Sequence, residues 1–206
     1  MFVGSDRYMK YSRGDASFWS FGFSGYDSTG VNPQYTSVSP ANQSATLVQG
    51  ASNWTLSFKN GETRVFDHTS GYLTSIIDRN GNTTQLSYDT AFRLVSVTDP
   101  ASHHLYFSYS GPSSYLVSGV SSDFGISLSY SYDGQGRLVR VTKPDSTTIS
   151  FQYDSNSFIS AVLDSNGKVL EQHTYDITGK GLTSSRAGGA ESITVSYPQP
   201  PQFKSD

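Results

Sequence analysis

The sequence predicts an all-β fold, and three observations support this prediction. Aromatic residues make up 14% of the 206 residues and charged residues only 15%, a composition too aromatic and too weakly charged for a disordered chain. Gly, Ser, Thr, Asn and Asp are abundant, which favours many turns over long helices. Short runs of alternating apolar and polar residues recur along most of the chain, as in half-buried strands. We therefore predict tandem antiparallel β-hairpins that form a curved sheet.

A repeat of about 22 residues orders these runs, and such self-similarity is typical of repeat architectures. The aromatic residue that closes each run stands at Phe66, Tyr88, Tyr109, Tyr132, Tyr153, Tyr175 and Tyr197. An aspartate follows directly at Asp67, Asp89, Asp133, Asp154 and Asp176. Six or seven residues after each of the first six aromatics comes an aliphatic residue, at Leu73, Leu94, Leu116, Leu138, Ile159 and Leu182.

Each repeat has the pattern of a hairpin. The run Leu128-Ser129-Tyr130-Ser131-Tyr132 alternates with period two, which places one face of a strand in a core and the other in water. Asp133-Gly134-Gln135-Gly136 then turns the chain, because Asp caps its own turn and Gly accepts a positive φ. Leu138 to Thr142 provides the second strand. Leu94 and Val97 are three residues apart, so we expect either Leu94 in the turn or a β-bulge between them.

The turns at the other end of the hairpins carry Asp78-Arg79-Asn80-Gly81-Asn82 and Asp164-Ser165-Asn166-Gly167. These segments resemble calcium loops only superficially, because they lack the alternating oxygen ligands and the closing glutamate of an EF-hand. Asn-Gly between two alternating runs is a strong hairpin signal, and we interpret both segments as turns.

Two parts of the chain depart from the repeat. The unit at Tyr109-Ser110-Gly111 lacks its aspartate, and Gly119 is expected to interrupt its second strand. The last units, from Gly179 to Gly189, have diverged from the pattern. Residues 1–52 do not follow the period and form an aromatic-rich lead-in. We therefore predict an irregular β lead-in over residues 1–52 and hairpin repeats with a degenerate C-terminal end over residues 53–206.

The segments Thr83–Pro100 and Ser131–Thr142 resemble the tyrosine–aspartate (YD) repeats of rearrangement-hotspot (RHS) proteins, insecticidal toxin complexes and teneurins. The resemblance covers about residues 53–197 and is specific, since residue types and period match together. It implies a large antiparallel sheet wound into a hollow shell, which in bacterial members encloses a toxic C-terminal domain. The chain is accordingly expected to be a structural part of such a shell, within a toxin or adhesion-type protein.

No residue is expected to be catalytic, to bind a cofactor or to ligate a metal. His68, His103, His104 and His173 lack ligand spacing, and the repeat aspartates are spaced by the period rather than gathered at a site. We therefore expect no enzyme. The alternative is a module that binds carbohydrate or protein through aromatic side chains on the sheet face.

The net charge of −3 and the lack of a basic stripe argue against a nucleic-acid partner. The sequence shows no signal-peptide core and no apolar stretch of membrane-spanning length. We expect a secreted or cell-surface location as part of a longer protein. The expected partners are further repeats of the same shell or an enclosed C-terminal domain, with carbohydrate as a further option.

Overall fold

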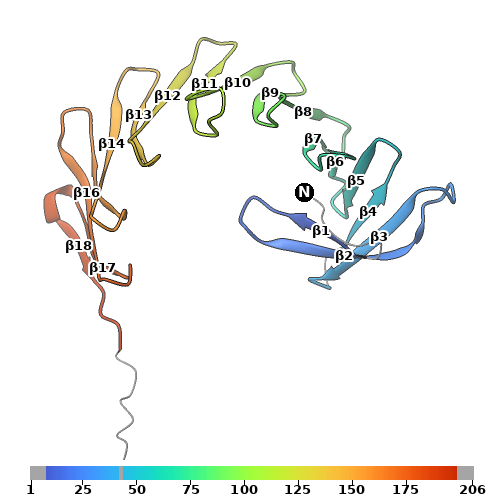
Figure 1. Ribbon diagram of the computed structural model, residues 1–206, viewed down its shortest axis with the longest axis horizontal. Helices are drawn as coiled ribbons and strands as arrows, with labels where there is room; N and C mark the ends of the chain where they lie inside the picture. Colours follow the sequence, from blue (N-terminus) through green and yellow to red (C-terminus); the bar gives the residue numbers. More distant parts are fainter. Residues whose placement is uncertain (1–7, 42–43, 199–206) are drawn as a thin grey trace, which may run out of the picture. The chain divides into compact units, whose positions relative to one another are not determined.

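The computed structural model describes residues 8–41 and 44–198, and these residues form antiparallel strands joined by short turns (Figure 1). The chain divides into two compact units at the boundary between Tyr106 and Phe107. Consecutive strands pair within each unit, as in a meander. The predicted all-β fold of tandem antiparallel hairpins is confirmed.

The first unit contains β1 (Tyr8–Ser12), β2 (Phe18–Tyr26), β3 (Pro33–Ser39), β4 (Ala45–Gln49), β5 (Asn53–Phe58), β6 (Thr63–Asp67), β7 (Leu73–Ile77), β8 (Thr83–Tyr88) and β9 (Leu94–Thr98). Strand β10 (His104–Tyr109) begins in the first unit, where it pairs with β9, and ends in the second. The second unit contains β11 (Val117–Ser122), β12 (Ser127–Tyr132), β13 (Leu138–Thr142), β14 (Thr148–Tyr153), β15 (Ile159–Leu163), β16 (Val169–Tyr175), β17 (Gly181–Arg186), the 3₁₀ helix η1 (Ala187–Gly189) and β18 (Glu191–Thr194).

A packed apolar core occupies the beginning of the first unit. Alternate residues of each strand point into it, as the two-residue period of a strand requires. The ring of Tyr11 on β1 lies 5.8 Å from the ring of Phe66 on β6, which joins strands far apart in sequence. The buried members are Met9, Tyr11, Phe21, Tyr35, Ala45, Leu47, Trp54, Leu56 and Phe66. This core includes residues on both sides of position 52, and the boundary predicted there stays a prediction.

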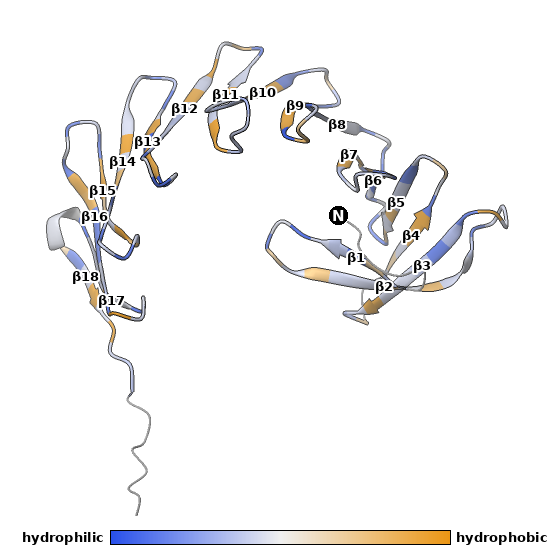
Figure 2. Cartoon of the chain, viewed as in Figure 1, coloured by the Kyte–Doolittle hydropathy of each residue, from blue (hydrophilic) through white to orange (hydrophobic). Residues whose placement is uncertain are grey.

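The later hairpins have no comparable core. Among the described residues after Phe66, Ala161 is the one apolar residue that is buried. Cross-strand pairs such as Leu86–Val97 and Phe151–Val162 are half-buried. The intervening pair Ser87–Ser96 lies on the opposite face of the sheet, which is rich in small polar side chains. Figure 2 shows the resulting alternation of apolar and polar segments along these strands.

A β-bulge recurs in the hairpins and explains the odd spacing of their aliphatic residues. Ser87 pairs with Ser96 and Tyr88 with Leu94, so Val95 is the extra residue of its strand. The expected bulge between Leu94 and Val97 is therefore confirmed. The same shift directly precedes Phe66, Tyr132, Tyr153 and Tyr175 in their hairpins.

One expectation about the irregular repeats was wrong. Gly119 does not interrupt its strand, since β11 runs through it and pairs it with Ser129. A Cβ atom at Gly119 would lie 2.8 Å from the Ser108 Oγ, so close packing rather than a strand break accounts for this glycine. In the last repeat, Gly181 pairs with Tyr175 where earlier repeats have Leu or Ile, and Leu182 lies at the bulge.

In the described ranges, no helix is long and apolar enough to cross a membrane.

Candidate functional site

Four of the five repeat aspartates lie in turns of one design. The Asp89 Oδ1 accepts hydrogen bonds from the backbone N–H groups of Ala91 and Arg93, both at 2.9 Å. The Asp89 N–H donates to the Arg93 carbonyl, and the Phe92 N–H donates to the Asp89 carbonyl. This pattern closes a three-residue hairpin loop in which the third residue takes the left-handed conformation. Asp133, Asp154 and Asp176 make the same backbone bonds, whereas Asp67 holds a wider loop.

The left-handed position of these turns is held by glycine in some repeats and by other residues in others. Gly136 and Gly179 occupy it with φ of 79° and 84°. Phe92 and Ser157 occupy the equivalent positions with φ of 59° and 68°. Side chains other than glycine are strained there, so the turn geometry is imposed by the aspartate and the strand register rather than by glycine alone.

The turns at the opposite ends of the hairpins follow the same design. Asp78 and Asp164 each accept N–H bonds from residues two and four positions later. Their carboxylates therefore serve the turn backbone, in agreement with the interpretation of both segments as turns. Within residues 8–41 and 44–198, no group of three or more His, Cys, Asp or Glu side chains is placed to hold a metal ion.

These hydrogen bonds stabilise the ionised carboxylates. The Arg93 backbone N–H, followed by the Arg93 guanidinium, lowers the pKa of Asp89 from its usual value. The corresponding bonds from Arg137 lower the pKa of Asp133. In the β2–β3 turn, bonds from the side chains of Thr29 and Asn32 lower the pKa of Asp27 to about 2. Bonds to the charged form of a carboxylate act in this direction because they are weakened on protonation.

The repeat tyrosines join each hairpin to the one before it. The Tyr153 hydroxyl donates to the Leu138 carbonyl at 2.8 Å, and Leu138 begins the second strand of the preceding hairpin. The same bond connects Tyr88 to Leu73, Tyr132 to Val117, Tyr175 to Ile159 and Tyr197 to Gly181, at 2.8 to 3.1 Å. We refer to this bond as the tyrosine clasp.

The tyrosine ring is also covered by the preceding hairpin. The guanidinium of Arg137 lies 4.5 Å from the centre of the Tyr153 ring, while its Nε donates to Asp133 at 2.7 Å. Phe158 packs on Tyr175, with ring centres 4.9 Å apart. Tyr72 and Lys180 contact Tyr88 and Tyr197 in the same way. In these four clasps the covering residue directly precedes the residue whose carbonyl the tyrosine binds.

The predicted repeat positions thus come together as pairs rather than as one cluster. Leu73, Leu94 and Leu138 pair across the hairpin with Phe66, Tyr88 and Tyr132 respectively. Phe66 belongs to the packed core, and Tyr109 ends β10. The sequence reasoning missed the covering residues, although an aromatic or basic residue recurs directly before the aliphatic position, at Tyr72, Arg93, Tyr115, Arg137 and Phe158.

The tyrosine–aspartate arrangement agrees with the comparisons to known proteins. The teneurin YD-shell family model matches residues 41–171. The chain belongs to this family. The match begins before residue 53 and ends before residue 197, the limits of the predicted resemblance. None of the curated proteins matches the sequence.

Solved structures show the same fold at low sequence identity. The chain is similar to the crystal structure of TcdB2-TccC3-Cdc42, with a TM-score of 0.51 and 10% identity over 87% of this chain. It is equally similar to a mutant Tc holotoxin pore of Photorhabdus luminescens, with a TM-score of 0.50 and 10% identity over 87% of this chain. The match covers 11% of each of those chains, so the present chain spans a small part of their length.

Proposed function

We propose that the chain is a non-catalytic wall segment of an RHS/YD-type shell, within a larger secreted or cell-surface toxin-associated protein. The tyrosine clasp is the observation that carries this proposal. Each clasp uses a carbonyl of the preceding hairpin, and four of the five also use a covering side chain from it, so a hairpin completes its contacts only in an array. Such nearest-neighbour stabilisation is typical of repeat proteins.

The aspartates support a structural role over a catalytic one. Asp89, Asp133 and Asp176 each bind the backbone of their own turn, which accounts for their recurrence. Toxin-complex proteins appear among the structures with this fold. We propose further repeats of the same shell as partners, together with an enclosed C-terminal domain.

The last strand offers a direct test. The Val195 N–H donates to the Leu182 carbonyl, and the register pairs Ile193 with Ser184. Because hydrogen-bonded positions alternate along an antiparallel pair, the N–H of Thr194 points to the other edge of β18, where a further hairpin would add. We expect the isolated chain to self-associate through this edge in a concentration-dependent way, as measured by light scattering.

Thr194→Pro removes that N–H and should shift the chain toward monomer, while Thr194→Val keeps the N–H and should associate as the unmodified chain does. A folded chain that stays strictly monomeric at all concentrations would contradict the proposed wall segment.

A further inference from the structure

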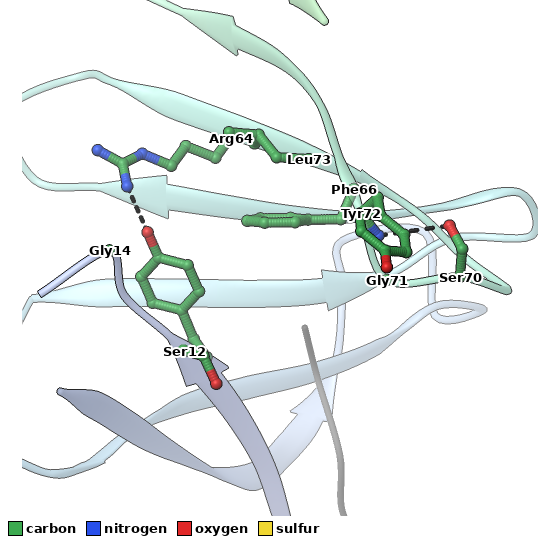
Figure 3. Close-up of a pocket in the computed structure, with 9 residues that line it drawn as sticks. Ser12, Gly14, Arg64, Phe66, Ser70, Gly71, Tyr72 and Leu73 are labelled. Atoms are coloured by element: carbon green, nitrogen blue, oxygen red, sulfur yellow. Dashed lines mark hydrogen bonds between the residues drawn. The ribbon is translucent and has the colours of Figure 1, made fainter. Parts of the chain in front are cut away.

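A hollow of about 380 Å³ lies in the first compact unit, between the end of β1 and the β6–β7 turn (Figure 3). Tyr11, Phe66 and Tyr72 line it together with Ser12 and Ser70, and the Ser70 hydroxyl donates to Asp67 at 2.8 Å, so its oxygen can accept a further hydrogen bond. Its volume falls within the range of about 300–1,000 Å³ that is usual for small-molecule sites. One tyrosine clasp borders the hollow, because the Tyr88 hydroxyl binds the Leu73 carbonyl and the Tyr72 ring contacts the Tyr88 ring.

The charged side chain that lines the hollow is already paired with a carboxylate. Arg64 is the one charged residue among the described residues that line it. The Arg64 Nε donates to Glu62 at 2.7 Å, and its Nη1 donates to the Tyr11 hydroxyl. An anionic ligand would have to compete with Glu62 for the guanidinium. The lining therefore favours an uncharged ligand.

An exposed pair of stacked rings extends the aromatic wall outward. Tyr72 is 40% exposed, and its ring lies parallel to that of Phe92, with centres 5.5 Å apart and planes 4° apart. Phe92 is 54% exposed and has a φ of 59°. The equivalent positions of later repeats hold Gly136, Ser157 and Gly179. A bulky, exposed ring held in the left-handed region is a reason to look for function at that position.

We propose that the hollow and the Tyr72–Phe92 pair bind a neutral sugar ring of an oligosaccharide. The apolar C–H face of a pyranose can stack on the Tyr72 ring, while its hydroxyls bond to Ser12 and Ser70. Because Arg64 is paired with Glu62, the lining offers no uncompensated charge, which favours a neutral glycan over a charged one. A proline-rich peptide also binds aromatic surfaces, but it requires an extended groove, whereas this site is a short hollow. The inference goes beyond the wall-segment function and does not depend on it.

The test uses the full chain with maltotriose, cellotriose and tri-N-acetylglucosamine, each titrated by calorimetry and by saturation-transfer NMR. A sialylated trisaccharide and a proline decapeptide serve as comparison ligands. We expect saturable binding of at least one neutral trisaccharide and of neither comparison ligand.

Variants then locate the site. Tyr72→Ala should weaken binding about tenfold through loss of stacking, whereas Tyr72→Phe should retain it. Phe92→Gly keeps the turn conformation and should weaken binding by a smaller factor, which provides a second test if Tyr72→Ala unfolds. Tyr115→Ala removes a 71% exposed tyrosine of the other unit and should have no effect.

The proposal is overturned if none of the neutral trisaccharides binds, or if the proline peptide or the sialylated sugar binds in their place. Undiminished binding to both folded Tyr72→Ala and Phe92→Gly variants would overturn it as well. Each of these outcomes leaves the association of β18 edges unaffected, so the two proposals fail independently.

Discussion

Residues 9–66 bury nine apolar side chains in one cluster, while the described residues from 67 onward bury one apolar side chain, that of Ala161. In the first region, rings from distant strands contact each other, as Tyr11 and Phe66 do. In the second, contacts run from one hairpin to the next through the tyrosine clasps and their covering residues. One chain therefore uses two modes of stabilisation: removal of apolar area from water, and repeated local hydrogen bonding and stacking.

The largest difference between the regions should appear on truncation of leucines. Leu56 is fully buried in the core, whereas Leu128 on β12 is half-buried. We expect Leu56→Ala to lower the free energy of unfolding by about 3–5 kcal/mol and Leu128→Ala by about 1–2 kcal/mol, because only the first leaves a closed cavity. Chemical denaturation of both variants checks this, and equal losses would remove the distinction between the regions.

The next effect concerns turn glycines of the repeat region. A Cβ at Gly179 would lie 2.5 Å from the Phe158 ring, in addition to the strain of its positive φ. We expect Gly179→Ala to cost about 2–3 kcal/mol and Gly136→Ala, which is strained but not crowded, about 1 kcal/mol.

Gly134 is the matched control for these variants, since it lies in the same turn as Gly136, its φ is not positive, and a Cβ there would meet nothing within 4 Å. Gly134→Ala should leave the midpoint of thermal unfolding unchanged. If all three variants behave alike, turn conformation does not limit the stability of the repeats.

A smaller effect is expected from a single clasp. Tyr132→Phe removes the hydroxyl that donates to the Val117 carbonyl at 2.8 Å, and should cost about 1 kcal/mol. Tyr130→Phe, on the same strand, provides the matched control and should be nearly neutral. Urea unfolding measures both variants, and a neutral Tyr132→Phe would argue that ring packing alone holds adjacent hairpins together.

The smallest effect per residue is expected when the pH is lowered and the turn aspartates become protonated. Hydrogen bonds lower the pKa of Asp89, Asp133 and Asp176 in the repeats, from the ~3.9 of an unfolded aspartate. A lowered pKa in the folded state stabilises above about pH 4, and this stabilisation is lost as the pH falls through the folded pKa. The pKa values of Asp15 and Asp27 are lowered as well, but aspartates with a lowered pKa are more numerous from residue 67 onward. Hydrogen exchange between pH 5 and 2 should therefore show the repeats losing protection before residues 9–66.

The substitutions Asp89→Asn and Asp133→Asn should weaken the pH dependence of hydrogen-exchange protection in the repeats. The asparagine amide keeps an acceptor oxygen for the turn but does not titrate. Simultaneous loss of protection in both regions would show that the turn aspartates do not govern the response to acid.

Much of the fold could be predicted from the sequence because its determinants are local. The turns depend on an aspartate and a left-handed residue within five positions, as in Asp133 to Arg137. The strands follow from alternation, and the odd spacing of Leu94 and Val97 indicated the bulge that the register shows. Gly119 was misjudged because the Ser108 hydroxyl that crowds it belongs to a neighbouring strand.

The sequence by itself determined the repeat, its turns, its strands and its family, since these depend on residues within one hairpin. Only the tertiary structure decided which groups meet between hairpins. The Tyr153 hydroxyl reaches a carbonyl fifteen residues earlier, and the Tyr11 ring meets Phe66 across the core. These contacts depend on strand register, on the bulges that shift it and on the folding of β1 onto β6, and no periodicity of residue types encodes them directly.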